Sequence, residues 1–258
     1  MIDSHCHLEQ KDYDKDRDEV IGQCKKELKA VVTSCAHPKD FDLTMQIAEK
    51  HKGFVFASAG LHPEYIKELR ENEKDELLEK IKQNRKNIFA IGEIGLDYFW
   101  VKDRNWQEKQ KELLAEIISF AKELKKPIVV HSRDCGEDAI KILEQEDAKQ
   151  VLLHLFGSRQ QMERVIQNSW LISIGPIIAR SKNHKKIARD FPLENILLET
   201  DSPWFGGSDP KGKPVRGTPL NIKIPAEKIA EEKKMPFGQV WKQCGKNAVK
   251  FFGLPIEI

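Results

Sequence analysis

The sequence has few of the features that mark secreted or membrane proteins. Its 258 residues include only five cysteines, an odd number, and no two of them form a CxxC pair. No apolar run approaches the ~18 residues that a membrane-spanning helix needs. The first residues also lack the basic and then apolar pattern of a signal peptide. We therefore expect reduced thiols and a cytoplasmic protein that does not enter a membrane.

Charge of one sign and phosphate-binding loops are also missing. The 43 basic and 41 acidic residues leave a formal charge of +2, which does not indicate nucleic-acid binding by the molecule as a whole. A local basic rim is compatible with this balance. No GxGxxG or Walker A loop follows the first predicted strand, although such loops are common in open α/β sheets.

What the sequence does contain is a regular alternation of short β-rich runs and amphipathic helical segments. In the clearest helix, apolar residues between 113 and 124 form one stripe, and Lys and Glu occupy the other face. Predicted strands cover the N-terminal residues and the segments 30–34, 54–59, 88–91, 128–130, 151–153, 171–174 and 196–198. Eight βα units predict a (β/α)8 TIM barrel that spans residues 1–258 as a single domain. A doubly wound open sheet is the alternative.

Residues that commonly bind metals follow these apolar runs. His5 and His7 are one residue apart, so in a strand both side chains point to the same face. Two adjacent imidazoles suit an ion such as Zn²⁺ or Mn²⁺, but the pair alone is a weak signal. In a barrel, functional residues lie at the carboxyl ends of the strands. Four more candidates stand at the predicted ends of strands four, five, six and eight: Glu93, His131, His154 and Asp201.

Each candidate also has an ordinary structural interpretation. Glu93 is compatible with a surface loop, His131 and His154 with the core, and Asp201 with a helix N-cap. Together, however, four histidines and two carboxylates predict a centre for two divalent ions (Mg²⁺, Mn²⁺ or Zn²⁺), on the order of 3.5–4 Å apart. Glu93 is the candidate bridging ligand, because its strand lies between the two groups of histidines. Asp201 is expected to ligate one ion and to accept a proton from the nucleophilic water.

Six segments match one known family. They are residues 3–8 (DSHCHL), 60–63 (GLHP), 92–98 (GEIGLDY), 127–134 (PIVVHSRD), 154–158 (HLFGS) and 199–204 (ETDSPW). With these segments the chain resembles the TatD-like metal-dependent deoxyribonucleases, a branch of the amidohydrolase-type barrels. The resemblance implies hydrolysis of DNA phosphodiesters and carries over the six candidates as metal ligands. More loosely, it carries over His62 and Arg133 as groups that face the substrate phosphate.

Each of the residues around this centre is compatible with either a substrate contact or a purely structural role. Arg133 can grip a phosphate bidentately or pair with Asp134, and His62 can contact a phosphate or be a turn residue without a role. The basic segments 183–186 and 211–216 can hold a DNA backbone or be solvated faces. The aromatic residues near strand ends four and eight can stack on bases or line a loop core. These are Tyr98, Phe99, Trp100, Trp106, Trp204 and Phe205. We assign structural roles to three further histidines, His37, His51 and His184.

The predicted function is hydrolysis of DNA by a metal-activated water. We expect exonuclease action on single-stranded DNA or 3′ ends, with no membrane and no obligate protein partner. The same centre is also compatible with hydrolysis of a small amide, lactone or phosphoester. A carbamylated lysine is common in that related group, and Glu93 in its place weakens this alternative. A third interpretation is a non-catalytic DNA-binding or scaffold protein, against which the intact ligand set argues.

Overall fold

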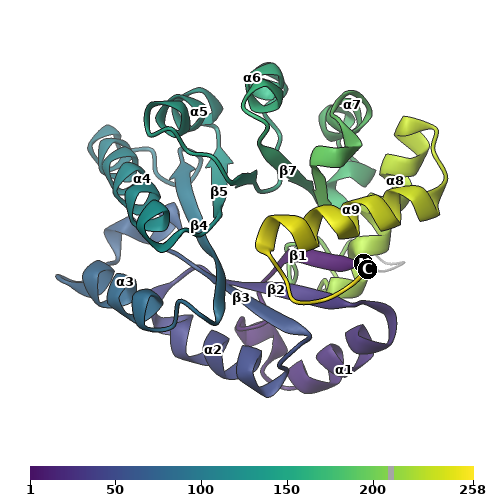
Figure 1. The fold of residues 1–258 in the computed structure, drawn as a ribbon, viewed down its shortest axis with the longest axis horizontal. Helices are drawn as coiled ribbons and strands as arrows, with labels where there is room; N and C mark the ends of the chain where they lie inside the picture. Colours follow the sequence, from purple (N-terminus) through teal and green to yellow (C-terminus); the bar gives the residue numbers. More distant parts are fainter. Residues whose placement is uncertain (209–211) are drawn as a thin grey trace.

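The protein folds as a barrel of parallel strands surrounded by helices. The computed structural model describes residues 1–208 and 212–258, and within these ranges eight parallel strands form one sheet in the order β1 to β8. The helices alternate with the strands along the chain and lie around the outside of the sheet (Figure 1). The prediction of a (β/α)8 barrel is therefore confirmed.

The bounds of the elements follow the predicted alternation closely. The strands are β1 (Ile2–Cys6), β2 (Ala30–Cys35), β3 (Val55–Ala59), β4 (Ile88–Asp97), β5 (Ile128–Arg133), β6 (Val151–Leu153), β7 (Leu171–Ile174) and β8 (Ile196–Leu198). The α-helices are α1 (Arg17–Glu27), α2 (Phe41–Lys50), α3 (Glu73–Gln83), α4 (Arg104–Leu124), α5 (Gly136–Gln145), α6 (Met162–Gln167), α7 (Lys182–Asp190), α8 (Lys223–Lys233) and α9 (Phe237–Phe252).

The two outer strands, β1 and β8, are joined mainly through the residues that follow β8. The amide of Asp201 donates to the carbonyl of His5 at 2.9 Å, and the amide of His7 donates to the carbonyl of Ser202 at 2.8 Å. Asp3 accepts hydrogen bonds from both the amide and the hydroxyl of Thr200. These bonds nearly close the barrel and hold the first residues of the chain against the segment after β8.

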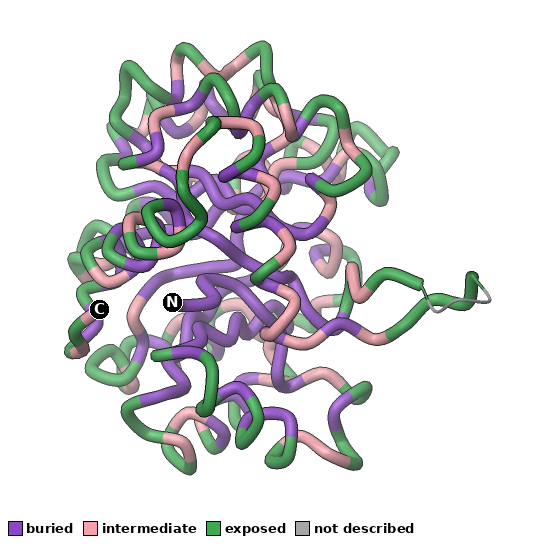
Figure 2. Tube along the Cα trace, turned by 90° about the vertical axis from the view of Figure 1, so that its right-hand side faces the viewer, coloured by how far each residue is buried: buried purple, intermediate pink, exposed green. Residues whose placement is uncertain are grey.

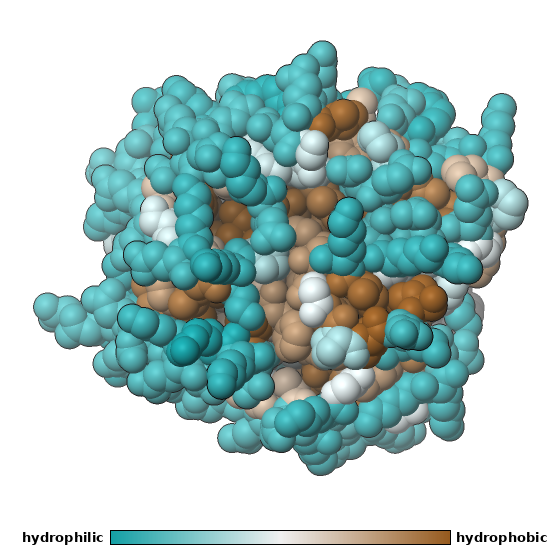
Figure 3. All heavy atoms as spheres, in the orientation of Figure 1, coloured by the Kyte–Doolittle hydropathy of each residue, from teal (hydrophilic) through white to brown (hydrophobic). Residues whose placement is uncertain are grey.

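One end of the barrel is filled with apolar side chains. Residues near the starts of most strands pack inside it, among them Ile2, Ala30 and Leu197, and α9 covers them with Phe251 and Phe252. Both chain termini and α9 lie at this end of the barrel (Figure 1). Hydrophobic residues gather toward the middle of the molecular face at this end (Figure 3). The polar candidates therefore lie at the opposite, carboxyl end of the strands.

Strand β4 extends further than predicted. We expected a strand over residues 88–91 with Glu93 at its end, but β4 continues to Asp97 and places Glu93 inside the strand. Its second half pairs with β5, with Gly95 opposite His131, after a shift of register between Ile91 and Ile94. Two glycines interrupt the β-branched pattern in this stretch. The sequence pattern therefore predicts a strand that is too short.

The exposed residues lie mainly along the outer faces of the helices and in the loops. Residues 207–208 and 212–215 are exposed and extend away from the barrel (Figure 2). The five cysteines are buried and free. Within the described ranges, no helix combines the length and apolar character that crossing a membrane requires. The predicted cytoplasmic location stays a prediction.

Candidate metal centre

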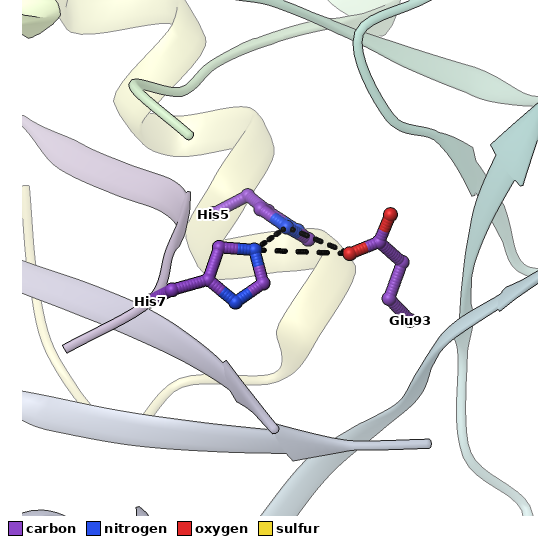
Figure 4. Close-up of side chains that lie close together, drawn as sticks. All are labelled: His5, His7 and Glu93. Carbon is purple, nitrogen blue, oxygen red and sulfur yellow. Dashed lines mark hydrogen bonds and ion pairs between the residues drawn. The ribbon is translucent and has the colours of Figure 1, made fainter. Parts of the chain in front are cut away.

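The carboxylate of Glu93 lies at the middle of the candidate site, and its two oxygens face different sets of side chains. Glu93 Oε2 lies 3.3 Å from His5 Nε2 and 3.8 Å from His7 Nε2, and these two nitrogens are 3.0 Å apart (Figure 4). His5 and His7 come from β1 and the residue just after it, and both are buried. The predicted convergence of these two imidazoles on one point is therefore present.

Asp201 completes this first group. Its Oδ1 lies 3.6 Å from His5 Nε2 and 3.3 Å from His7 Nε2. The residue has a φ of +53°, in the left-handed region that L-amino acids rarely adopt. Its backbone is held there by the hydrogen bond to the carbonyl of His5. Asp201 is therefore a fixed part of the site and does not cap an α-helix.

A second group surrounds the other oxygen of Glu93. Oε1 lies 2.9 Å from His131 Nδ1, 3.2 Å from His154 Nε2 and 3.4 Å from His62 Nε2. His131 lies within β5, His154 directly follows β6, and His62 precedes the 3-10 turn η3 (Pro63–Lys67). Each of the six predicted ligands therefore lies in one of two groups that share Glu93.

Three carboxylates behind the histidines are residues for which the sequence analysis assigned no role. Glu9 lies 3.1 Å from His7 Nδ1, and Glu199 lies 3.2 Å from His154 Nδ1. Asp97 lies 2.9 Å from His131 Nε2. A carboxylate that accepts the N–H of one ring nitrogen leaves the other nitrogen with a free lone pair, which is how proteins orient histidine ligands. The available nitrogens are then Nε2 of His7 and His154 and Nδ1 of His131, which all face Glu93.

His62 has the reverse arrangement. Its Nδ1 accepts a hydrogen bond from the amide of Glu64 at 3.2 Å, so the proton of the neutral ring is on Nε2. That N–H points toward Glu93 Oε1. His62, Glu93 and His131 are close enough to form a metal-binding cluster by distance alone. The proton on Nε2 makes His62 a hydrogen-bond donor in the site, in keeping with its predicted place facing a phosphate.

The electrostatics of the site couple these groups strongly. Burial alone would raise the pKa of Glu93, but the charges of His154 and His62 and the hydrogen bond from His131 hold it well below its usual range. Burial alone would lower the pKa of His154, but Glu93 and Glu199 raise it well above its usual range. Without a metal, histidine protons therefore supply the positive charge that the buried carboxylates require.

The donor set fits divalent metal ions. It combines imidazole nitrogens and carboxylate oxygens, the ligands that Zn²⁺ and Mn²⁺ accept, in a buried place where isolated charges are costly. The triads His5–His7–Glu93 and His5–His154–Glu199 also have ligand atoms within 4.8 Å of one another. Among the described residues, His5 Nδ1 is a buried atom without a hydrogen-bond partner. Buried polar atoms without a hydrogen-bond partner are uncommon in folded proteins. A functional role of the residue is one explanation for such an atom.

A large cavity opens over this centre. Its volume is about 1810 Å³, and its lining includes the predicted metal ligands His7, Glu93 and His154 and the predicted phosphate contacts His62 and Arg133. The guanidinium of Arg133 lies 3.8 Å from the centre of the Phe99 ring, and no ion pair with Asp134 is present in the described part of the chain.

The aromatic residues predicted near strand ends four and eight divide into two sets. Trp100, Trp204 and Phe205 line the cavity. The other three candidates pack elsewhere: Tyr98 donates to Asp138 at 2.7 Å, Phe99 lies under Arg133, and Trp106 lies under Lys109. Tyr98 therefore fits the interpretation as loop packing, whereas Trp106 lies within α4.

The basic segments contribute less to the cavity than their charge suggests. In the segment 183–186, Asn183 donates to the carbonyl of Gly157 and His184 is buried against Ser181, although both line the cavity. In the segment 211–216, Lys211 lies outside the described residues. Arg216 pairs bidentately with Asp16 at 2.6 and 2.8 Å. Its charge is thus already balanced by a carboxylate.

The two other histidines assigned structural roles lie outside the cavity lining. His37 packs its ring against Tyr65 and accepts from the amide of Lys39. His51 pairs with Asp18 at 2.9 Å near the outer surface.

Comparison with known proteins identifies the family. The model of the TatD related DNase family matches residues 2–253. The human protein called Deoxyribonuclease TATDN3 is 35% identical over 262 residues, which cover 98% of this chain and 94% of that protein. An uncharacterised metal-dependent hydrolase of Methanocaldococcus jannaschii is 35% identical over 259 residues, which cover 97% and 96%.

A solved structure agrees with these matches. The TatD homolog YJJV from Escherichia coli superposes with a TM-score of 0.87 at 25% identity, covering 99% of this chain and 98% of that one. The chain therefore belongs to the TatD-related DNase family and is, by homology, a metal-dependent hydrolase.

Proposed function

We propose that this protein hydrolyses phosphodiester bonds in DNA at a centre for two divalent ions, with Mg²⁺, Mn²⁺ and Zn²⁺ as candidates. His5, His7 and Asp201 would hold one ion, and His131 and His154 the other. Glu93 would bridge them, because each of its oxygens faces one group. Divalent ions in such a centre lower the pKa of a water molecule and neutralise phosphate charge.

The observation that carries this proposal is the division of the ligands into two groups by one carboxylate. Around Oε2 of Glu93 lie two histidines and Asp201, and around Oε1 lie His131 and His154. A single tetrahedral ion binds four ligands, fewer than the six that converge here. The outer carboxylates support the same assignment, since they leave the ligating nitrogen of His7, His131 and His154 unprotonated.

The protein's own residues have separate tasks in this reaction. Asp201 lines the cavity and accepts the proton of the attacking water. Its basicity is determined by burial and by the nearby histidines. Burial would raise its pKa, but the hydrogen bond from His7 and the charges of His154 and His5 lower it. Arg133 and the Nε2–H of His62 are placed to hold the phosphate oxygens.

The cavity favours a polymer over a small molecule. Pockets for drug-sized ligands typically occupy roughly 300–1,000 Å³, whereas this cavity measures about 1810 Å³. The relatives named as deoxyribonucleases point to DNA. We propose that the substrate is a single strand or a 3′ end, which the protein shortens as an exonuclease.

The proposal is tested with metal-stripped protein and a 5′-labelled single-stranded oligonucleotide. Adding Mg²⁺, Mn²⁺ or Zn²⁺ should produce a ladder of shortened products, and Asp201→Asn should abolish it. The matched control is Asp75→Asn, an exposed residue on α3. If no metal supports cleavage of DNA while a small amide or lactone is turned over, the nuclease proposal is wrong. DNA binding that survives Asp201→Asn, without turnover in either form, would instead indicate a scaffold.

The ligand assignment is tested separately by metal analysis. Glu93→Ala should lose both ions, because both groups depend on its carboxylate. His131→Ala should lose the ion of the Oε1 group. Unchanged metal content in both variants would refute the assignment, whatever the substrate is.

A further inference from the structure

We propose that Trp204 is a stacking platform for an unpaired nucleobase next to the scissile phosphodiester. The inference rests on the proposed function and adds to it the part of the substrate that is recognised. Trp204 lines the cavity and is 49% exposed. The centre of its ring lies 4.8 Å from the centre of the His7 ring, in an edge-to-face arrangement. An exposed indole thus borders one of the two ligand groups directly.

The backbone that carries Trp204 is held in place although it belongs to a long loop. Its amide donates to the carbonyl of Asp201 at 3.1 Å, and the amide of Gly217 donates to the carbonyl of Pro203 at 2.7 Å. The two chain segments approach so closely that a Cβ on Gly217 would lie 2.4 Å from the carbonyl oxygen of Trp204. The indole is therefore presented by a packed backbone, which reduces the entropy lost when a ligand binds.

The second segment is itself anchored to the barrel. Tyr13 donates from its hydroxyl to the carbonyl of Gly217 at 2.8 Å. Arg216 pairs with Asp16 through two hydrogen bonds and lies over the Tyr13 ring. Arg216, which we had considered as a contact for the DNA backbone, instead fixes the loop that bears Trp204.

Backbone strain brackets the same residue. Asp201 has a φ of +53° and Phe205 a φ of +56°, both in the left-handed region although neither is glycine. Non-glycine residues persist there only where the surrounding structure imposes the conformation, and such residues cluster at functional sites. One strained residue directs the carboxylate of Asp201 into the ligand group, and the other follows the exposed indole.

The chemistry of the platform points to a nucleobase. A half-exposed indole gains by covering its apolar face, and stacking on a base is tolerant of sequence because each base has a π-face. In a duplex interior both faces of a base are covered by its neighbours. A base reaches Trp204 at the lowest cost from an unpaired end or a single strand, because a base inside a duplex must first be unstacked. This agrees with the substrate proposed above.

The test compares oligonucleotides with and without a base at the cleavage point. A single strand ending in adenosine is matched with strands in which a stable abasic residue replaces either nucleotide flanking the terminal bond. For the wild type, one of these replacements should lower kcat/KM, and the affinity of the metal-free protein, by about tenfold. In Trp204→Leu the ratio of these values between the intact strand and that abasic strand should approach one. In Trp204→Phe, which keeps a smaller ring, the ratio should take an intermediate value.

The control is Phe237→Leu, because Phe237 is also an exposed aromatic residue (40%) but lies at the start of α9, outside the cavity lining. It should retain the wild-type ratio. Equal metal content in all variants shows that the ligand groups are intact. If wild type binds and cleaves all three strands equally, or if Trp204→Leu keeps the wild-type ratio, the inference is wrong. Wild-type discrimination in binding that Trp204→Leu abolishes, without cleavage of either strand, would support the platform and refute only the nuclease proposal.

Discussion

Replacing Glu199 by glutamine isolates the role of the carboxylates behind the histidines. Glu199 is fully buried and accepts hydrogen bonds from His154 Nδ1 at 3.2 Å and from the amide of Leu155 at 2.9 Å. It also accepts one from the hydroxyl of Ser173 at 2.6 Å. Glutamine has nearly the same shape but only one acceptor oxygen, so the three donors can no longer all be satisfied.

The two orientations of the glutamine amide have different costs. If its oxygen keeps the bond from Leu155, its NH₂ group faces His154 Nδ1, which must then act as an acceptor. The neutral His154 ring would carry its proton on Nε2, the nitrogen 3.2 Å from Glu93, and would lose the lone pair that a metal needs. If the amide is reversed, the amide of Leu155, a partly buried residue, loses its partner. An unsatisfied buried donor costs about 1–3 kcal/mol of unfolding free energy.

The expected result is a selective loss at one of the two ion sites. Loss of such an outer partner weakens metal binding about 10–100-fold, which corresponds to about 1.4–2.7 kcal/mol. Titration of metal-stripped Glu199→Gln with Zn²⁺ against a chromophoric chelator should show this loss for one ion and near wild-type affinity for the other. The matched control, Glu112→Gln, changes an exposed residue on α4. Wild-type affinity for both ions in Glu199→Gln would refute the reasoning from histidine tautomers.

Four further outcomes are expected. Burial lowers the pKa values of His7 and His154, but hydrogen bonds and carboxylates outweigh it and raise both well above 6.5. The stability that these protons supply is fully present below pH 6.5 and is lost as the pH rises through the folded pKa values, so urea denaturation without metal should show a falling unfolding free energy above that pH. Affinity for Zn²⁺ should rise over the same interval, because the metal competes with these protons. Gly95→Ala should lower the unfolding free energy by about 3 kcal/mol and reduce metal content, because Gly95 has a φ of +144° and a Cβ there would lie 2.0 Å from the carbonyl oxygen of His131. Gly238→Ala, where a Cβ has open space, is its control. Arg133→Gln should raise KM for an oligonucleotide about tenfold without changing metal content, and an unchanged KM would remove Arg133 as a phosphate contact.

The convergence of the six candidates was predictable because barrel geometry brings the carboxyl ends of parallel strands to one face. A histidine or carboxylate directly after an apolar run is placed there by its position in the chain alone. This holds for His154, which follows β6, and for His5 and His7, which differ by one strand period. Their roles as ligands stay predictions, but their proximity does not depend on side-chain detail.

The outer carboxylates could not be assigned in the same way. Glu9 and Glu199 stand near strand ends in the sequence, but so do carboxylates that face solvent. What distinguishes them is which ring nitrogen they contact, and this depends on side-chain rotamers and on packing between β1, β2 and β8. Thr33, for example, donates to Glu9 from the neighbouring strand β2 at 3.0 Å and helps to fix it behind His7. The pairing of Arg216 with Asp16 likewise joins residues 200 positions apart.

The tautomers also explain how four of the histidines around Glu93 take different parts. His7, His131 and His154 each have one ring nitrogen engaged by a carboxylate, and the remaining lone pair faces Glu93. His62 lies at a similar distance, but the backbone amide of Glu64 occupies its Nδ1, and a proton faces the site instead. Distance alone would count His62 as a further ligand. The hydrogen bond on its far side excludes this for the neutral ring and directs an N–H into the site, in keeping with the proposed contact to a phosphate oxygen. The chemistry that each imidazole can perform is therefore determined by the group behind it.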